Sequence, residues 1–175
     1  MKFGTIVAIL SAAAVTLSAC ASHRTTTIQT SSGNATVTTS QDNKSVTVRN
    51  KEGTTSIGQN VDASKLGAPV YPGAQANEQG AISSSTDKGT SVMAGFKTSD
   101  PFEKVEAFYK QQLPAGSEKM NTSANNSSIA SFQIGTGDAS DQVAVQVTSS
   151  KAGETDILIT HVVTDTKPTP YPSAS

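Results

Sequence analysis

Residues 99–116, SDPFEKVEAFYKQQLPAG, carry the clearest helix signal in this chain of 175 residues. Asp100 can cap the helix, Pro101 suits its first turn, and Glu103 can complete a capping-box-like pair with the cap. Apolar side chains then recur at helical spacing on one face: Phe102, Val105, Tyr109 and Leu113, with Phe108 beside them. Because Pro114 ends the pattern, the segment predicts one amphipathic helix that covers an apolar surface.

Strand-like alternation flanks this helix on both sides. Apolar residues alternate with polar ones through 89–98 before the helix, and the same period of two runs through 143–147 after it. The segment 156–163 has apolar side chains at both parities, which is typical of a central strand. Further strands are expected at 117–122 and 129–134.

The segment 21–65 is rich in Ser and Thr and contains no aromatic residue, so it can bury little apolar surface. Turn-forming residues divide it into short strand-like pieces: 25–30, 35–39, 45–49 and 54–57. A meander of this kind is marginal alone. We expect it to act as a spacer and packing ribbon for the domain that follows. The alternative is a β edge on which a ligand chain is aligned.

The chain begins with the features of a secretory leader. Lys2 is followed by an almost uncharged run, 3–17. At about 1.5 Å per helical residue, this run is too short for the ~30 Å apolar core of a membrane. Leu17-Ser18-Ala19-Cys20 comes next, and Cys20 is the only cysteine of the chain.

The sequence resembles those of small, poorly characterised bacterial lipoproteins. Residues 17–20 match the lipobox, which ends in an obligatory Cys, and the motifs PVYPGA (69–74) and DPFEKVEAFYK (100–110) follow a Thr- and Gly-rich ribbon. The resemblance implies that the Cys20 thiol is diacylglycerylated, that the leader is cut before Cys20, and that the new amino group is acylated. Two or three acyl chains would anchor the protein stably. Ala21 after the cysteine, in place of Asp, is similar to an outer-membrane sorting pattern.

Together these patterns predict an α+β fold, in which a mainly antiparallel sheet carries one amphipathic helix across a face and follows a Thr-rich β-meander. The expected organisation has four parts: a lipoprotein signal peptide at 1–19, a lipidated N-terminus with spacer and ribbon at 20–65, a globular α+β domain at 66–164, and a Pro-rich tail at 165–175.

Composition excludes several classes of function. With 13 Lys and Arg against 14 Asp and Glu, the formal net charge is -1, which argues against a basic surface for nucleic acid. A single Cys excludes an intrachain disulfide framework and a Cys-rich zinc site. No Gly-x-Ser-x-Gly elbow occurs in the sequence. We therefore expect no catalytic residues, no cofactor and no metal.

The remaining candidate residues favour structural roles. His161 shares strand parity with Ile157, and we expect it to be a hydrogen-bonded histidine rather than a base or ligand. The stretch 135–138 is followed by a Val-rich strand and not by a helix, which favours a hairpin loop over a phosphate-binding loop. Asp138 and Asp141 alone offer too few oxygens for Ca²⁺. The aromatic residues are expected to fill the core.

The sequence thus predicts a non-enzymatic, lipid-anchored envelope protein that presents a small binding or structural domain to the periplasm. Its expected partners are the membrane, through the acyl anchor on Cys20, and envelope proteins. The alternative is a carrier of a small apolar or lipid-like ligand, which an enclosed aromatic-lined cavity of several hundred Å³ would favour.

Overall fold

The structure is a computed structural model that describes residues 23–30, 33–59, 62–125, 127–135, 140–149 and 153–165. Within these residues ten strands form one antiparallel sheet: β1 (His23–Thr30), β2 (Gly33–Ser40), β3 (Ser45–Asn50), β4 (Gly53–Gly58), β5 (Gln75–Thr86), β6 (Gly89–Thr98), β7 (Glu118–Ala124), β8 (Ser127–Ile134), β9 (Asp141–Ser149) and β10 (Thr155–Thr164). The helix α1 (Phe102–Gln112) and the short 3-10 helix η1 (Ala63–Lys65) complete the elements.

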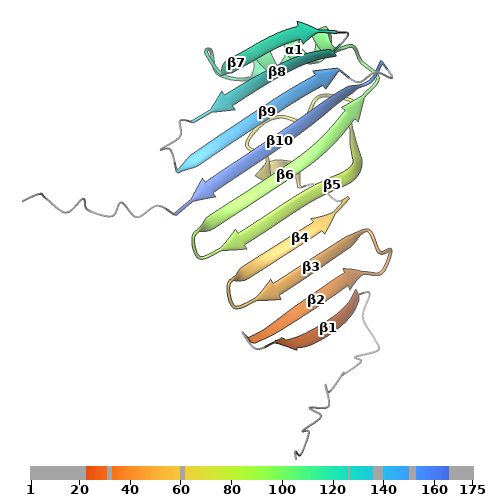
Figure 1. The fold of residues 1–175 in the computed structure, drawn as a ribbon, viewed down its shortest axis with the longest axis vertical. Helices are drawn as coiled ribbons and strands as arrows, with labels where there is room; N and C mark the ends of the chain where they lie inside the picture. Colours follow the sequence, from red (N-terminus) through yellow and green to blue (C-terminus); the bar gives the residue numbers. More distant parts are fainter. Residues whose placement is uncertain are drawn as a thin grey trace, which may run out of the picture.

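The chain fills the sheet in two passes. The strands β1 to β6 follow one another as a meander from one edge toward the middle. The chain then crosses through α1 to the opposite edge, and β7 to β10 return until β10 lies between β9 and β6 (Figure 1). The sequence expectation of a central strand at 156–163 is confirmed by these two pairings of β10.

The α+β class expected from the sequence is wrong. The described residues contain one 11-residue α-helix against ten strands, so the fold is predominantly β. The Thr-rich strands that we expected to precede the sheet are part of it, because β4 pairs with β5 from Gly53 opposite Thr86 to Gly58 opposite Ala81. Thr has a high strand propensity, and pairing on both sides stabilises strands that would be marginal alone.

The strand that joins the two halves, β5, has no counterpart in the sequence expectation. Its residues QANEQGAISSST show no apolar alternation. The pairing register with β6 shifts between Ala76 and Ala81, which marks a β-bulge. Gly80 lies in this bulge with a φ of 62°, and a Cβ on it would collide with the carbonyl oxygen of Gly58. Gly is therefore the residue that fits here.

The two faces of the sheet differ in what covers them. The helix α1 and the segment 62–74 pack on one face, which we call the covered face, while the opposite face carries no described element and is called the bare face (Figure 1). The core lies between the covered face and α1. Its largest fully buried side chains are Tyr109, Phe132, Leu66, Ile157, Ile159, Val105, Val145, Val147 and Thr155.

Candidate functional site

The covered face changes character halfway across the sheet. Under α1 it presents apolar residues from β8, β9 and β10, such as Phe132, Val145 and Ile159, which lie opposite one another in register. Beyond β10 the same face continues through Val92 on β6 to Ser83 on β5, and from there the residues in register are mostly Ser and Thr. The sheet is therefore apolar where the helix lies and hydroxyl-rich where it does not.

An open pocket of about 450 Å³ lies at this boundary. Its volume falls within the roughly 300–1,000 Å³ range of small-molecule sites. The lining residues come from β4, β5, β6, β10 and η1: Thr54, Ser56, Lys65, Ser83, Ser84, Ser85, Thr90, Val92 and His161. Among the described residues, the hydroxyls of Ser83, Ser85 and Thr90 have no hydrogen-bond partner. These groups are available to a ligand.

One wall of the pocket is built by His161 and the segment that crosses over it. The Nδ1 atom of His161 lies 2.7 Å from the backbone oxygen of Lys65, and its Nε2 atom lies 2.8 Å from Oδ1 of Asp141. Both partners are acceptors, so both contacts are hydrogen bonds at once only when the ring carries two protons and a positive charge. The segment approaches closely, since a Cβ on Gly67 would lie 2.6 Å from Cγ2 of Val143 and 3.2 Å from the His161 ring.

The expectation that His161 is a hydrogen-bonded strand residue is confirmed by these contacts. The sequence pattern did not indicate its contact with Asp141, which was weighed only as a Ca²⁺ ligand together with Asp138. Asp138 lies outside the described residues. No group of three or more His, Cys, Asp or Glu side chains gathers in the described part of the chain in a way that could hold a metal ion.

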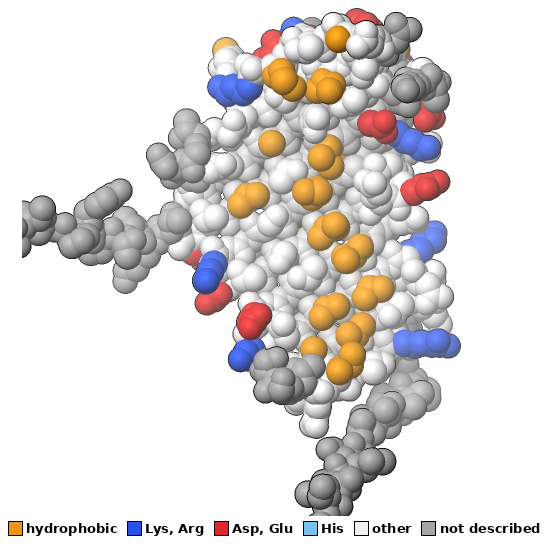
Figure 2. All heavy atoms as spheres, in the orientation of Figure 1, with side chains coloured by type: hydrophobic (Ala, Val, Ile, Leu, Met, Phe, Trp, Pro, Cys, Tyr) orange, Lys and Arg blue, Asp and Glu red, His pale blue; other side chains and the backbone are white. Residues whose placement is uncertain are grey.

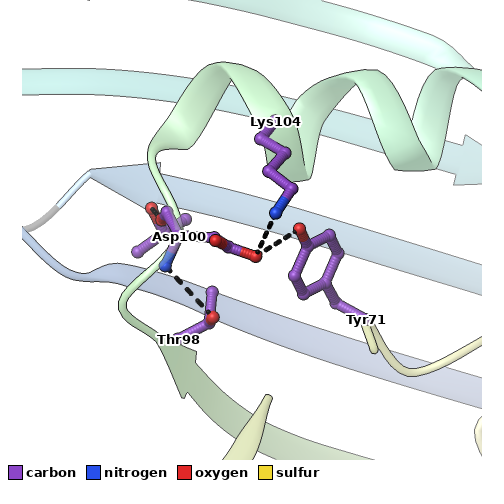
Figure 3. A network of polar contacts seen from close by, with 5 residues as sticks. Tyr71, Thr98, Asp100 and Lys104 are labelled. Atoms are coloured by element: carbon purple, nitrogen blue, oxygen red, sulfur yellow. Dashed lines mark hydrogen bonds and ion pairs between the residues drawn. The ribbon is translucent and has the colours of Figure 1, made fainter. Parts of the chain in front are cut away.

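The segment 62–74 is held against the start of α1 by a polar network (Figure 3). The hydroxyl of Tyr71 donates to Oδ2 of Asp100 at 2.7 Å, and Nζ of Lys104 lies 3.0 Å from the same oxygen. Thr155 on β10 donates its hydroxyl to the backbone oxygen of Asp100 at 2.7 Å. The network thus links the segment, the helix and a central strand at one point.

This network corrects the expected capping of the helix. Pro101 is the N-cap residue, and α1 begins without a side-chain hydrogen bond at its cap. Asp100 does not cap, because its carboxylate binds Tyr71 and Lys104. These two contacts, with the Tyr71 hydrogen bond the larger cause, hold the pKa of Asp100 below its usual value. Farther along the helix, Nζ of Lys110 lies 2.5 Å from Oε1 of Glu106, one helical turn before it.

We expect Tyr71→Phe to lower the unfolding temperature by a few degrees at pH 7, because Asp100 loses its strongest partner. A lowered folded-state pKa contributes stability above the unfolded value, 3.8, and this contribution is lost as the pH falls through the folded-state pKa of Asp100. The difference between the two proteins should therefore shrink below pH 3.8 in thermal unfolding followed by circular dichroism. An equal difference at pH 7 and pH 2 would show that Tyr71 acts through packing alone.

The aromatic side chains form the core, as expected, and two of their three ring contacts join α1 to its surroundings. Phe108 makes edge-on contacts with Tyr71 and Tyr109, each with ring centroids 5.2 Å apart, and Tyr109 lies 6.0 Å from Phe132. The hydroxyl of Tyr109 is buried without a hydrogen-bond partner in the described structure. Burial raises the pKa of this hydroxyl above its usual value, because the charged form would be poorly solvated there.

Several sequence expectations fall outside this structure. Cys20, the leader 1–19 and the tail after 165 are not among the described residues. Within the described ranges, no helix combines the length and apolarity that a membrane crossing requires. The hydroxyl pocket itself was missed, because small Ser and Thr side chains on three strands carry no distinctive motif.

Residues 76–156 match the model of the START domain-like family. The match begins in β5, includes α1 and the strands up to β9, and ends at the start of β10, so it leaves out β1 to β4 and most of β10. Comparisons with curated proteins and with solved structures give no match. Over residues 76–156, slightly less than half of its length, this chain is similar to START domain-like proteins.

Proposed function

We propose that this protein is a non-catalytic, lipid-anchored ligand-binding protein of the bacterial envelope, facing the periplasm from the outer membrane. The anchor is Cys20, on the strength of the lipobox at 17–20. The ligand site is the hydroxyl-lined pocket on β4, β5 and β6. The family resemblance over 76–156 supports a ligand-binding role in general terms.

The pocket's lining is the observation that carries this proposal. Val92 provides an apolar floor, Ser and Thr hydroxyls surround it, and Lys65 also lines the pocket, with its Nζ atom 3.6 Å from Oδ2 of Asp62. A small amphiphile with an acidic group fits this combination, because its apolar part covers Val92 while its charge meets Lys65. The site is open and hydroxyl-lined, which differs from the enclosed aromatic cavity that we associated with a carrier.

The structural role of His161 supports the proposal that the protein is not an enzyme. Both ring nitrogens are occupied, one by the Lys65 carbonyl and one by the Asp141 carboxylate. A general base needs a free nitrogen within reach of the proton that it takes. Here the ring fixes the pocket wall. The acyl anchor confines the site to the membrane surface and raises its effective concentration toward membrane-bound ligands and envelope proteins.

The test uses residues 21–175, which contain every described residue and lack the acyl anchor. The probe is anilinonaphthalene sulfonate, an anionic amphiphile whose fluorescence rises on binding. Ser83→Phe fills the pocket and is expected to weaken probe affinity about tenfold, or about 1.4 kcal/mol. Thr25→Phe is the matched control, since Thr25 lies on the same face of the edge strand β1, outside the pocket.

A second arm tests the charge. Lys65→Gln should weaken binding of the sulfonate probe but leave binding of the neutral analogue N-phenyl-1-naphthylamine unchanged. Only the sulfonate probe carries a negative charge that can interact with the Lys65 ammonium group. If Ser83→Phe and Thr25→Phe bind the sulfonate equally well, the pocket is not the ligand site and the proposal fails.

A further inference from the structure

The bare face carries a continuous row of apolar side chains that the ligand pocket does not use. Successive residues of the row are cross-strand partners: Val37 with Val48, Val46 with Ile57, Ile57 with Ile82, and Ile82 with Met93. Ile28 on β1 extends it beside Ala35. Figure 2 shows the row as an orange stripe that runs across the strands from β1 toward β7.

This row is exposed in the single chain. The large hydrophobic side chains that the structure leaves most open, between 38% and 51% exposed, are Ile28, Val48, Ile57, Ile82, Met93 and Met120. The strand registers place all six on the bare face. The row is contiguous across six strands, β1 to β6, and an exposed apolar surface of this kind is typical of an interaction site.

We propose that a second copy of this chain covers the bare face, so that two sheets pack face to face as a two-layer sandwich. Sheets stack in this way about 10 Å apart through their apolar faces. The two copies would be related by a two-fold axis that lies in the interface and runs along the row. The row of one copy then lies on the row of the other, so the same surface is used by both copies.

The size of the face suits a stable dimer. Ten strands spaced about 4.8 Å apart span about 43 Å, and six residues per strand cover about 20 Å, which gives a footprint of about 860 Å² per copy. A specific interface needs about 800 Å² from each partner. The full face therefore offers the required area without any further element.

The charges around the row favour a second copy over a lipid surface. Figure 2 shows both acidic and basic side chains at the rim of the bare face and none along the row. A face that lies on an anionic membrane would carry mainly Lys and Arg at its rim. A neutral, mixed rim around an apolar centre is instead complementary to its own copy.

The test places the photo-crosslinker p-benzoylphenylalanine at position 48, on the bare face, in the full chain within intact cells that express two differently tagged copies. Position 47, the residue before it on β3, lies on the covered face and serves as the matched control. We expect an adduct that carries both tags from position 48, and at least about a tenfold lower yield from position 47, since only the former lies in the interface.

A charge in the row should break the contact without unfolding the chain. Ile82→Glu is expected to lower the yield from position 48 about tenfold or more, because a buried carboxylate has no partner there. Thr38→Glu, on the opposite face of β2, should leave it unchanged. No two-tag adduct from position 48, equal yields from both positions, or an adduct with lipid or another protein only would overturn the proposal.

Discussion

Phe132→Ala is expected to lower the free energy of unfolding by about 3–5 kcal/mol, the range for truncating a buried Phe. Phe132 is 2% exposed on β8, lies opposite Val145 on β9, and contacts the ring of Tyr109 on α1. The substitution leaves a cavity at the point where the helix meets the sheet. Because a domain of this size is stable by only about 5–15 kcal/mol, the loss is a large share of the total.

Urea unfolding at pH 7 measures this effect, and Ile82→Ala gives the contrast. Ile82 is an equally apolar strand residue, but it is 45% exposed on the bare face. In the isolated, dilute chain its truncation should cost less than about 1 kcal/mol, because little burial is lost. Equal costs for the two substitutions would mean that the core does not lie between α1 and the covered face.

Cys20→Ser is expected to abolish incorporation of radiolabelled palmitate and to leave a precursor that still carries the leader 1–19. The thiolate is the nucleophile that takes the lipid, and a serine hydroxyl is far less nucleophilic at neutral pH. Metabolic labelling followed by gel electrophoresis of the membrane fraction shows both changes. This is an all-or-none effect, unlike the graded loss from a core substitution.

His23→Ala is the control for the anchoring experiment, since His23 lies three residues after Cys20 and outside the lipobox. It should be labelled and processed like the unaltered protein. Palmitate on the Cys20→Ser protein would refute lipidation at this residue. The ligand pocket shares no residue with the lipobox, so this result would not bear on the proposed binding site.

The elements that could be predicted from the sequence are those with a local signal. The apolar spacing in 102–113 and the stop at Pro114 predicted α1, although the expected cap at Asp100 was wrong, and strict alternation in 143–147 predicted β9. The Thr-rich pieces at 45–49 and 54–57 were also found as strands, because turn residues separate them. Local propensity and period were sufficient in each case.

Pairing between distant segments could not be predicted in the same way. The strand β5 is formed because β4 and β6 offer it hydrogen-bond partners on both sides, not because of its own residues. Without β5, the Thr-rich meander has no link to the rest of the sheet, which is why the sequence suggested a separate ribbon and an α+β fold. A pairing of this kind is a tertiary effect that overrides weak local preference.

The candidate site also depends on contacts between segments that are distant in the sequence. His161 was recognised as a hydrogen-bonded strand residue from its parity, but its contact with the Lys65 carbonyl spans 96 residues of sequence. The hydroxyls of Ser83, Ser85 and Thr90 come together only after β5 and β6 have paired. The chain is rich in such residues, so only their position on the covered face distinguishes them.

The most direct test of the proposed binding site compares two neighbouring residues of β6. Val92 lines the pocket on the covered face, while Met93 lies in the apolar row of the bare face. In methyl-labelled residues 21–175 titrated with anilinonaphthalene sulfonate, the methyl NMR signals of Val92 should shift and that of Met93 should stay in place. A shift of Met93 alone, with Val92 unmoved, would contradict the account and place ligand binding on the opposite face of the sheet.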